Sequence, residues 1–335
     1  MEKTASGFQK ERASTLVLRS WNADEISDVY GLPFPDLIFR AQLVHRRFHD
    51  PAEIQGCQLL SVKTGGCPED CGYCPQSALY DTPEMREPLK DPADVFAAAA
   101  RSKVEGATRF CIGAAWKNAP SGARFDRVLI MVRGIRSLGL EACATLGMLS
   151  REQADMLAAA GLTAYNHNLD TSPEYYAKVV STRRYEDRLE TLRHVRAAGI
   201  SVCCGGIVGL GETREDRIGL LNELARQDPQ PESVPINMLV KVKGTPLENA
   251  ETVDLIEFVR TVATARIVLP LSKVRLSAGR NEMSEEAQAL CFLAGANSIF
   301  LGERLLTTPN PGADRDGQML ERLGMRLSAT EATAD

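Results

Sequence analysis

The chain has 335 residues, of which 44% are hydrophobic and 25% charged, and these proportions are typical of a globular protein rather than of a collagen-like, disordered or coiled-coil chain. A formal net charge of −5 gives no basic surface that would suggest a nucleic-acid partner. The longest apolar runs fall far short of the roughly 20 residues that a membrane span needs, and the polar N-terminus carries no apolar signal segment, so we expect a cytoplasmic enzyme with no nucleic-acid or membrane partner.

Residues 1–50 are expected to form an N-terminal extension. The segment is polar, contains two prolines and shows one short helical pattern over 24–30. His45 and His49 stand one helical turn apart, a spacing that can bind a metal ion. Without further ligands nearby, and with two arginines following His45, we interpret this stretch as a solvated basic face.

From about residue 57, short β-branched or apolar runs alternate with longer amphipathic segments rich in Ala, Leu, Arg and Glu. The runs predict strands at 58–63, 108–113, 140–145, 163–169, 200–208, 233–240, 273–277 and 297–301. The amphipathic segments predict helices at 92–104, 124–137, 151–160, 185–198, 214–227, 253–266 and 284–294. A capping-box pattern at Ser150 and Gln153, and glycines where helices should end, mark several of these boundaries.

Eight strand–helix units predict parallel strands joined by right-handed crossovers. The number matches an α/β fold of the (βα)8 TIM-barrel type over residues 51–325, with a doubly wound open sheet as the alternative. Residues 326–335 are expected to be a disordered tail. In such a barrel the reactive groups come from the C-terminal ends of the strands and from the loops that follow them.

Nine cysteines in a chain without a secretion signal argue against a disulfide framework. Cys67, Cys71 and Cys74 form a C-x3-C-x2-C pattern in the long loop after the first predicted strand. Soft thiolates select iron–sulfur clusters, zinc or copper(I). A structural zinc site needs four ligands and this loop contains no histidine, whereas a 4Fe–4S cluster held by three cysteines leaves one iron open to another molecule. The pattern therefore favours a 4Fe–4S cluster over zinc.

A second group of candidate ligands is spread over separate strands. Cys111, Cys143 and one of the neighbours Cys203 and Cys204 fall in the second, third and fifth predicted strands, where they can point into the barrel or serve as small packing residues. Cys203 and Cys204 have opposite parity, so only one of them can face inward, and parity alone does not choose. Arg275 lies in the seventh predicted strand and forms either a salt bridge at the barrel rim or a fourth ligand beside the thiolates.

The cysteine loop resembles that of the radical S-adenosylmethionine enzymes. Tyr73, between the last two cysteines, fits the family pattern, and residues 205–212 resemble the element whose backbone approaches the adenine. The family's Gly-Gly-Glu element after the second strand is absent, since residues 113–116 read Gly-Ala-Ala-Trp. The resemblance implies that S-adenosylmethionine is bound at the open iron and cleaved to a 5′-deoxyadenosyl radical by an electron from the cluster.

Longer strings within residues 54–323, including 165–173, 235–246 and 305–311, resemble the biotin synthase family of this superfamily. The resemblance implies radical insertion of sulfur into dethiobiotin to form biotin. It also implies that a 2Fe–2S cluster deep in the barrel supplies the sulfide and that Cys203, rather than Cys204, is one of its ligands. The implied ligands of this second cluster are Cys111, Cys143, Cys203 and Arg275. The remaining cysteines are interpreted as packing residues: Cys57, Cys204 and Cys291.

The same resemblance assigns roles to polar residues of the barrel. Asp170 is expected to bind the ribose hydroxyls, Asn168 to bridge cofactor and substrate, and Arg188 to pair with the methionine carboxylate. Asn237 is expected to bind the ureido ring of dethiobiotin, with a barrel-rim capping role as the alternative for each asparagine. His167, of opposite parity to the strand-four residues, is expected to face the helices. The walls of the adenosyl pocket are assigned to Ala114, Trp116, Ile207 and Val240.

Further expectations from the family are a homodimer, a flavodoxin-type electron donor and iron–sulfur assembly proteins that rebuild the second cluster. Lipoyl synthase is a competing hypothesis, but it uses an additional N-terminal cysteine motif and this chain has no cysteine before Cys57. A radical enzyme that rearranges amino acids or matures hydrogenases would share the cysteine loop. A non-enzymatic zinc or iron–sulfur protein is the hypothesis from outside the enzyme class.

Overall fold

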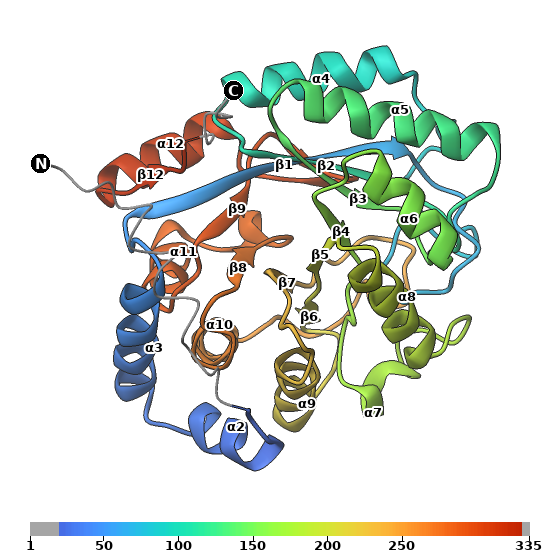
Figure 1. The fold of residues 1–335 in the computed structure, drawn as a ribbon. Coiled ribbons are helices and arrows are strands. Elements are labelled where there is room, and N and C mark those ends of the chain that lie inside the picture. Colours follow the sequence, from blue (N-terminus) through green and yellow to red (C-terminus); the bar gives the residue numbers. More distant parts are fainter. Residues whose placement is uncertain (1–19, 330–335) are drawn as a thin grey trace, which may run out of the picture.

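The computed structural model describes residues 20–329, and at its centre parallel strands form a closed barrel surrounded by helices (Figure 1). The barrel strands are β1 (Glu53–Lys63), β2 (Arg109–Ala114), β3 (Glu141–Thr145), β4 (Ala164–Asn166), β5 (Ser201–Cys203), β6 (Gly206–Val208), β7 (Ser233–Met238), β8 (Lys273–Leu276) and β9 (Ser298–Phe300). Because β1 pairs with both β2 and β9, the sheet closes on itself. The predicted (βα)8 barrel is confirmed, and the open-sheet alternative is wrong.

The fifth predicted strand is interrupted, unlike its neighbours. It divides into β5, which pairs with β4 and β7, and β6, which pairs with β7 alone. The break falls at Gly205, where a Cβ atom would lie 1.9 Å from the carbonyl oxygen of Pro235 in β7. Only glycine allows this close approach of the two backbones.

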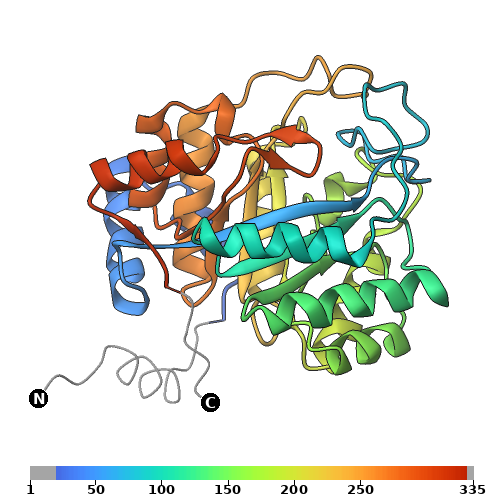
Figure 2. The same ribbon diagram turned by 90° about the horizontal axis from the view of Figure 1, so that it is seen from above.

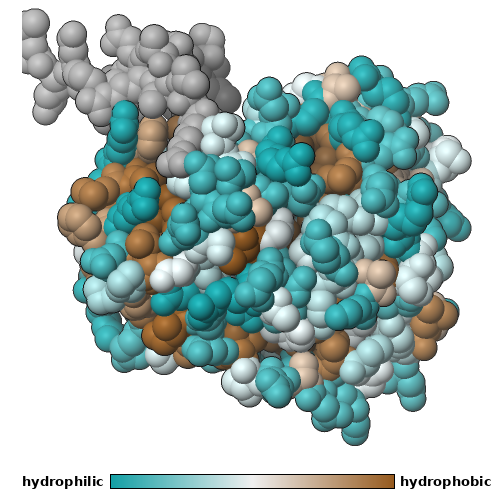
Figure 3. All heavy atoms as spheres, turned by 90° about the horizontal axis from the view of Figure 1, so that it is seen from below, coloured by the Kyte–Doolittle hydropathy of each residue, from teal (hydrophilic) through white to brown (hydrophobic). Residues whose placement is uncertain are grey.

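Helices cover the outside of the barrel. Each agrees with a predicted helix to within a few residues, except the short α7, which was not predicted. They are α4 (Pro92–Val104), α5 (Ala123–Ser137), α6 (Arg151–Ala159), α7 (Pro173–Tyr176), α8 (Tyr185–Ala197), α9 (Arg214–Ala225), α10 (Leu255–Val268) and α11 (Glu285–Leu293). The capping box at Ser150 and Gln153 is present at the start of α6. Among the described residues, no helix combines the length and the hydropathy needed to cross a membrane. On the face in Figure 3, apolar (brown) residues are interspersed with polar ones.

The N-terminal extension contributes two described helices, α2 (Ala23–Tyr30) and α3 (Phe34–Phe48), which pack against α9 and α10. The predicted solvated basic face is confirmed for Arg46 and Arg47, which are exposed, and is wrong for the histidines. His45 is 1% exposed, and His49 Nε2 lies 2.8 Å from Arg266 Nη1 and 2.9 Å from the carbonyl oxygen of Pro270. The histidine side of α3 faces α10 and its buried arginine, a contact that the spacing of two histidines does not reveal. Residues 1–19 of the extension lie outside the described residues.

These two histidines are expected to make the fold sensitive to acid. Burial, followed by the charge of Arg266, lowers the pKa of His45 to about 3 and that of His49 to about 2. Below about pH 6.5 the unfolded chain therefore binds protons that the folded chain does not. Each histidine then lowers the free energy of unfolding by up to about 1.4 kcal/mol per pH unit.

Urea unfolding at about pH 7.5 and about pH 5.5 measures this loss. We expect the full free energy of unfolding above about pH 6.5 and a decline in it as the pH falls below that value. His45→Gln should show a smaller decline than the unsubstituted protein, because one of the two protons is no longer bound on unfolding. An equal decline in both proteins would show that His45 does not contribute.

The C-terminal part returns to the barrel. It contains the hairpin of β10 (Arg304–Leu305) and β11 (Thr308–Pro309), then α12 (Ala313–Arg322) and β12 (Arg326–Leu327). The expected disordered tail over 326–335 differs from the structure at its start, since β12 pairs in parallel with the first residues of β1. A buried ion pair between Arg280, in the turn after β8, and Asp316 links that turn to α12. Residues 330–335 lie outside the described residues.

Candidate active site

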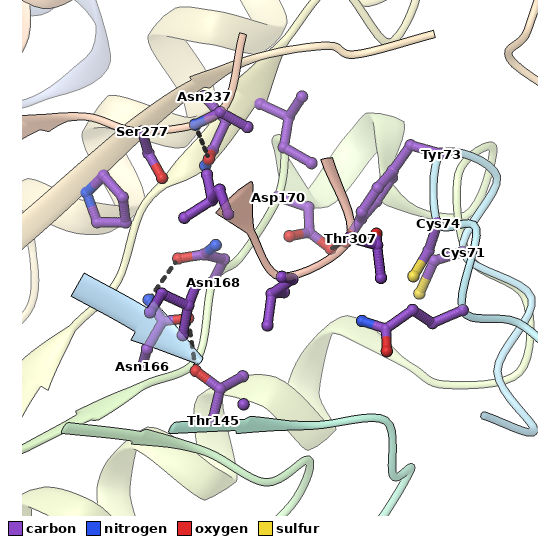
Figure 4. A pocket seen from close by; sticks show the side chains of 18 of the residues that line it. Cys71, Tyr73, Cys74, Thr145, Asn166, Asn168, Asp170, Asn237, Ser277 and Thr307 are labelled. Atoms are coloured by element: carbon purple, nitrogen blue, oxygen red, sulfur yellow. Dashed lines mark hydrogen bonds between the residues drawn. The ribbon is translucent and has the colours of Figure 1, made fainter. Parts of the chain in front are cut away.

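A cavity of about 310 Å³ lies at the C-terminal end of the barrel, enclosed by strand ends and the loops that follow them (Figure 4). The loop after β1 and the loop after β7 lie side by side over this end (Figure 2), joined by a hydrogen bond from Leu247 N–H to the Gly72 carbonyl. Every residue predicted to bind a cluster, cofactor or substrate lines the cavity: Cys67, Cys71, Tyr73, Cys74, Cys111, Ala114, Trp116, Cys143, Asn168, Asp170, Arg188, Cys203, Ile207, Asn237, Val240 and Arg275.

The cysteine loop is folded so that its thiols face this cavity. Cys67 is held on both sides, by its N–H to Gln76 O at 2.9 Å and by its carbonyl to Ala78 N at 2.6 Å. Cys74 N–H donates to Cys71 O at 2.9 Å, which closes a tight turn between the last two cysteines. In Figure 4 the sulfurs of Cys71 and Cys74 lie next to each other at the cavity wall. All three thiols are free.

Two acidic residues within the loop anchor it to the segment before α8. Asp70 accepts hydrogen bonds from the backbone N–H groups of Ser181 at 2.9 Å and Thr182 at 3.1 Å. Burial raises the pKa of Asp70, but hydrogen bonds from the hydroxyls and backbone N–H groups of Ser181 and Thr182 outweigh it and hold the pKa at about 2. Glu69 is buried and pairs with Arg183 at 3.3 Å and with Lys117 at 3.4 Å. No sequence pattern indicated this anchoring, because Asp70 and its partners lie more than 100 positions apart in the chain.

The thiols of the loop suit a cluster better than a single ion. In a 4Fe–4S cluster each cysteine binds a different iron atom. The cysteine sulfurs are therefore farther apart than the ligands of a single metal ion. Burial raises the pKa of Cys71 to about 12 and that of Cys74 to about 11, so both are protonated when free. Binding of iron would displace these protons.

Beside the cysteine loop, Tyr73, Asp170 and Arg188 form one buried network. Asp170 Oδ2 accepts from Tyr73 Oη at 2.8 Å and from Arg188 Nη2 at 2.6 Å. The remaining nitrogens of Arg188 donate to Tyr176 Oη and to the Asn168 carbonyl. Asp170 adopts a φ of 68°, which turns its side chain toward the cavity just after β4. Arg188, expected to meet a carboxylate of the cofactor, thus has a carboxylate of the protein as its counter-ion.

The asparagines of the barrel are tied to one another and to the backbone. Asn168 Oδ1 accepts from Asn166 Nδ2 and from Gly205 N–H, both at 3.2 Å, which leaves its amide nitrogen available to a ligand (Figure 4). Asn237 donates to Gly206 O at 2.9 Å and accepts from Ala278 N–H at 3.1 Å. Its amide group keeps one N–H and one lone pair for a ligand. It also links β6 and β7 to the loop after β8, which fits the alternative of a rim-capping role.

His167 is buried at 4% exposure, and burial lowers its pKa well below the ordinary value, so it is neutral. Its ring packs against that of Tyr165, with centroids 6.2 Å apart. His167 also contributes to the cavity lining, which its expected orientation toward the helices did not foresee.

Deeper in the barrel lies a second group of thiols. Cys111 and Cys143 stand opposite each other in the pairing of β2 with β3, and the interaction between their thiols raises the pKa of Cys111 and lowers that of Cys143. Cys203 Sγ lies 3.3 Å from Asn166 Nδ2 and 3.6 Å from Arg275 Nη1. Cys203 lines the cavity, whereas Cys204 is fully buried outside it.

Arg275 is buried among these thiols and is 1% exposed. Its Nε donates to Ser298 Oγ at 2.9 Å, its Nη2 lies 3.4 Å from Gln55 Oε1, and its guanidinium stacks 4.9 Å from the centre of the Phe300 ring. Within the described part of the chain it forms no salt bridge with a carboxylate, so the expected alternative of a rim salt bridge is wrong. A buried guanidinium surrounded by thiols suits an anionic, sulfur-bound group.

Several residues of the site escaped prediction from the sequence. Phe300 lines the cavity from β9, and Ser298, two positions earlier on the same face of that strand, contacts Arg275. Strand parity alone would have marked both. Thr307 and Thr308 reach the cavity only because the C-terminal hairpin folds over the barrel end, which no local pattern indicates.

Comparisons with known proteins agree with these features. Residues 61–224 match the family model described as the Radical SAM superfamily, and residues 235–326 match the Biotin and Thiamin Synthesis associated domain. The chain is 59% identical over 311 residues to the biotin synthase of Ralstonia nicotianae, covering 93% of this chain and 86% of that protein. It is 56% identical over 319 residues to the biotin synthase of Photobacterium profundum, covering 95% and 91%.

Solved structures with low sequence identity share the fold. Methylornithine synthase (PylB) superposes with a TM-score of 0.78 at 16% identity, covering 93% of this chain and 95% of that chain. The hydrogenase maturase HydG from Carboxydothermus hydrogenoformans gives a TM-score of 0.76 at 17% identity, covering 96% and 79%. At these identities the likeness concerns the barrel architecture alone.

Proposed function

This chain belongs to the biotin synthase family of radical S-adenosylmethionine enzymes, and we propose that it converts dethiobiotin into biotin inside the barrel cavity, between two iron–sulfur sites. The enzyme class and the role in biotin synthesis follow from membership of the family. The proposal concerns which residues of this chain carry the reaction and how they divide the work.

At the outer site, Cys67, Cys71 and Cys74 would hold the 4Fe–4S cluster of the superfamily. Three free thiols facing one cavity, on a loop anchored by Asp70 and Glu69, support this assignment. When bound there, the cluster and S-adenosylmethionine supply a radical that abstracts hydrogen from saturated carbons, which no acid or base side chain can deprotonate usefully.

The residues between the two sites would position cofactor and substrate. The carboxylate of Asp170, held by Tyr73 and Arg188, suits a pair of ribose hydroxyls. The amide nitrogen of Asn168 and the remaining amide groups of Asn237 suit a ureido ring, which offers both N–H and C=O groups. The apolar walls for the adenosyl group would be Ala114, Trp116, Ile207 and Val240.

At the inner site, Cys111, Cys143, Cys203 and Arg275 would hold the 2Fe–2S cluster, which supplies the sulfur atom of biotin. The support is the burial of all four side chains around the closed end of the cavity. Because these side chains are buried, a cluster held there would supply sulfur to a substrate at a site shielded from bulk water by the surrounding strands. A homodimer, a flavodoxin-type electron donor and iron–sulfur assembly proteins remain expectations from the family.

One observation carries the proposal: two groups of thiols line one cavity at the C-terminal end of the barrel, with the carboxylate of Asp170 and the amides of Asn168 and Asn237 also lining it. The test is an anaerobic assay of the reconstituted protein with dethiobiotin, S-adenosylmethionine and a chemical reductant. We expect both 5′-deoxyadenosine and biotin to form, each detected by mass spectrometry. Formation of 5′-deoxyadenosine without biotin would contradict the substrate, and absence of both would contradict the reaction.

A further inference from the structure

The ends of three neighbouring strands bring a hydroxyl, an amide and a thiol together at the cavity wall. Thr145 is the last residue of β3, Asn166 the last of β4 and Cys203 the last of β5, and all three line the cavity. Asn166 and Cys203 stand directly opposite each other in the pairing of β4 with β5. Neither Thr145 nor Asn166 belongs to the ligand sets proposed above for the clusters, the cofactor or the substrate.

The amide nitrogen of Asn166 donates to two neighbours with proposed roles. Its Nδ2 lies 3.2 Å from Asn168 Oδ1, 3.3 Å from Cys203 Sγ and 3.3 Å from the carbonyl oxygen of Cys203. An amide nitrogen carries two N–H groups, so one can serve Asn168 while the two acceptor atoms of Cys203 share the other. Asn166 therefore connects the residue proposed to meet cofactor and substrate with a residue proposed to hold the inner cluster.

Thr145 supports the orientation of this amide group (Figure 4). Its Oγ1 donates to Asn166 Oδ1 at 3.2 Å, and the hydroxyl must be the donor because the amide oxygen carries no hydrogen. A reversed amide would place its oxygen against Asn168 Oδ1, which already accepts from Gly205 N–H, so that two acceptors would face each other. Thr145 thus supplies the partner that the amide oxygen needs in the orientation that suits Asn168.

A hydrogen bond to a cysteine sulfur affects a cluster that the sulfur binds. Reduction adds negative charge, which is spread over the cluster and its thiolates. An N–H donor stabilises this charge, so the reduction potential is higher with the hydrogen bond than without it. The contact between the Asn166 amide and Cys203 Sγ is therefore placed to influence the potential of the inner cluster.

Building on the proposed function, we propose that Thr145 is a positioning residue of the inner site that acts through Asn166. Its hydroxyl holds the Asn166 amide with the nitrogen toward Asn168 and Cys203. In this orientation the Asn166 amide keeps the oxygen of Asn168 engaged, so that the nitrogen of Asn168 faces the substrate, and it keeps an N–H group on the sulfur of Cys203. Neither effect requires Thr145 to touch the substrate or the cluster.

The test compares variants that remove or keep the hydroxyl. Thr145→Val removes it at nearly constant size, Thr145→Ala removes it and leaves space, and Thr145→Ser keeps it. Thr264→Val is the matched control, because Thr264 is 0% exposed, donates its hydroxyl to the Arg260 carbonyl within α10 and lies outside the cavity.

Two properties are measured on the anaerobically reconstituted proteins. A redox titration followed by visible absorption gives the reduction potential of the 2Fe–2S cluster. Equilibrium dialysis with S-adenosylmethionine present and reductant absent gives the affinity for dethiobiotin without turnover. Thermal unfolding of the cluster-free proteins shows whether each variant is folded, and Thr145→Ala provides both measurements if valine at this position prevents binding of the cluster.

We expect Thr145→Val and Thr145→Ala to lower the potential of the inner cluster and to weaken dethiobiotin binding about twofold to tenfold, as the loss of one hydrogen bond predicts. Thr145→Ser should restore both properties, and Thr264→Val should leave both unchanged. Wild-type values in Thr145→Val overturn the inference. A weaker affinity without a shift in potential also overturns it, because one amide is proposed to serve both neighbours. Equal defects in Thr145→Ser and Thr145→Val overturn it as well, because the shape of the side chain would then be responsible.

The wild-type protein separates this inference from the proposed function. A reconstituted wild type that lacks a 2Fe–2S cluster or does not bind dethiobiotin would contradict the proposed function. If the wild type has both properties and Thr145→Val matches it in potential and affinity, the proposed function stands and only the role of Thr145 is wrong.

Discussion

Replacing Cys71 with serine is expected to abolish both cleavage of S-adenosylmethionine and formation of biotin. Cys71 is 8% exposed, and its sulfur lies beside that of Cys74 at the cavity wall. A serine hydroxyl is a hard, weakly acidic ligand that binds iron poorly in place of a thiolate. With two cysteines the outer cluster has no stable attachment, and no radical forms. Iron content, absorption in the visible range and yields of 5′-deoxyadenosine and biotin measure the loss.

Cys291→Ser is the matched control for this prediction. It makes the same substitution at a buried thiol of α11 that lies outside the cavity, so it reports what the change of a buried sulfur to oxygen does to folding alone. We expect Cys291→Ser to keep both activities. A Cys71→Ser protein that still releases 5′-deoxyadenosine would show that the outer cluster is not held by this loop.

Asp170→Asn is expected to weaken both the fold and the binding of S-adenosylmethionine. The substitution leaves the Arg188 guanidinium, which is 5% exposed, without its counter-ion, and breaking a buried ion pair in this way costs roughly 3–5 kcal/mol. Asparagine accepts the positive φ of this position as readily as aspartate, so backbone strain does not explain the loss. Urea unfolding gives the stability, and equilibrium dialysis of the reconstituted protein gives the affinity.

A double variant separates the two effects of Asp170. Combining Asp170→Asn with Arg188→Met removes both charges, so we expect part of the stability to return while the affinity for S-adenosylmethionine stays low. Asp155→Asn, which breaks an exposed pair with Arg151, should change stability by only a few tenths of a kcal/mol. If Asp170→Asn behaves like Asp155→Asn in both measurements, Asp170 has neither role.

Much of the architecture was accessible from local patterns. The alternation of apolar runs with amphipathic segments predicted eight strands and the helices between them. Each strand or helix must bury one face, and the spacing of apolar residues within a short stretch of sequence shows which face that is. The C-x3-C-x2-C motif was equally accessible, because one short loop supplies all three thiols. Its position directly after the first strand could be read from the sequence without knowing how the strands pair.

The structure changed the interpretation where distant segments meet. His45 and His49 form no basic surface, because α3 lies on α10 above Arg266. The first residues of the expected tail form β12, because they pair with the backbone at the start of β1. In both cases the partner lies more than 200 residues away in the chain, and residue spacing carries no information about such a contact.

Amino-acid order alone determined that this protein is an α/β barrel with a three-cysteine loop at the C-terminal end of its first strand. The tertiary structure showed that Cys203 and not Cys204 enters the cavity, a choice that strand parity had left open and the family resemblance had favoured. Only the tertiary structure decided that Asp170 is the counter-ion of Arg188. The physical reason is that period and spacing fix which face of a strand a side chain occupies, whereas the register between strands fixes which side chains meet across a closed barrel.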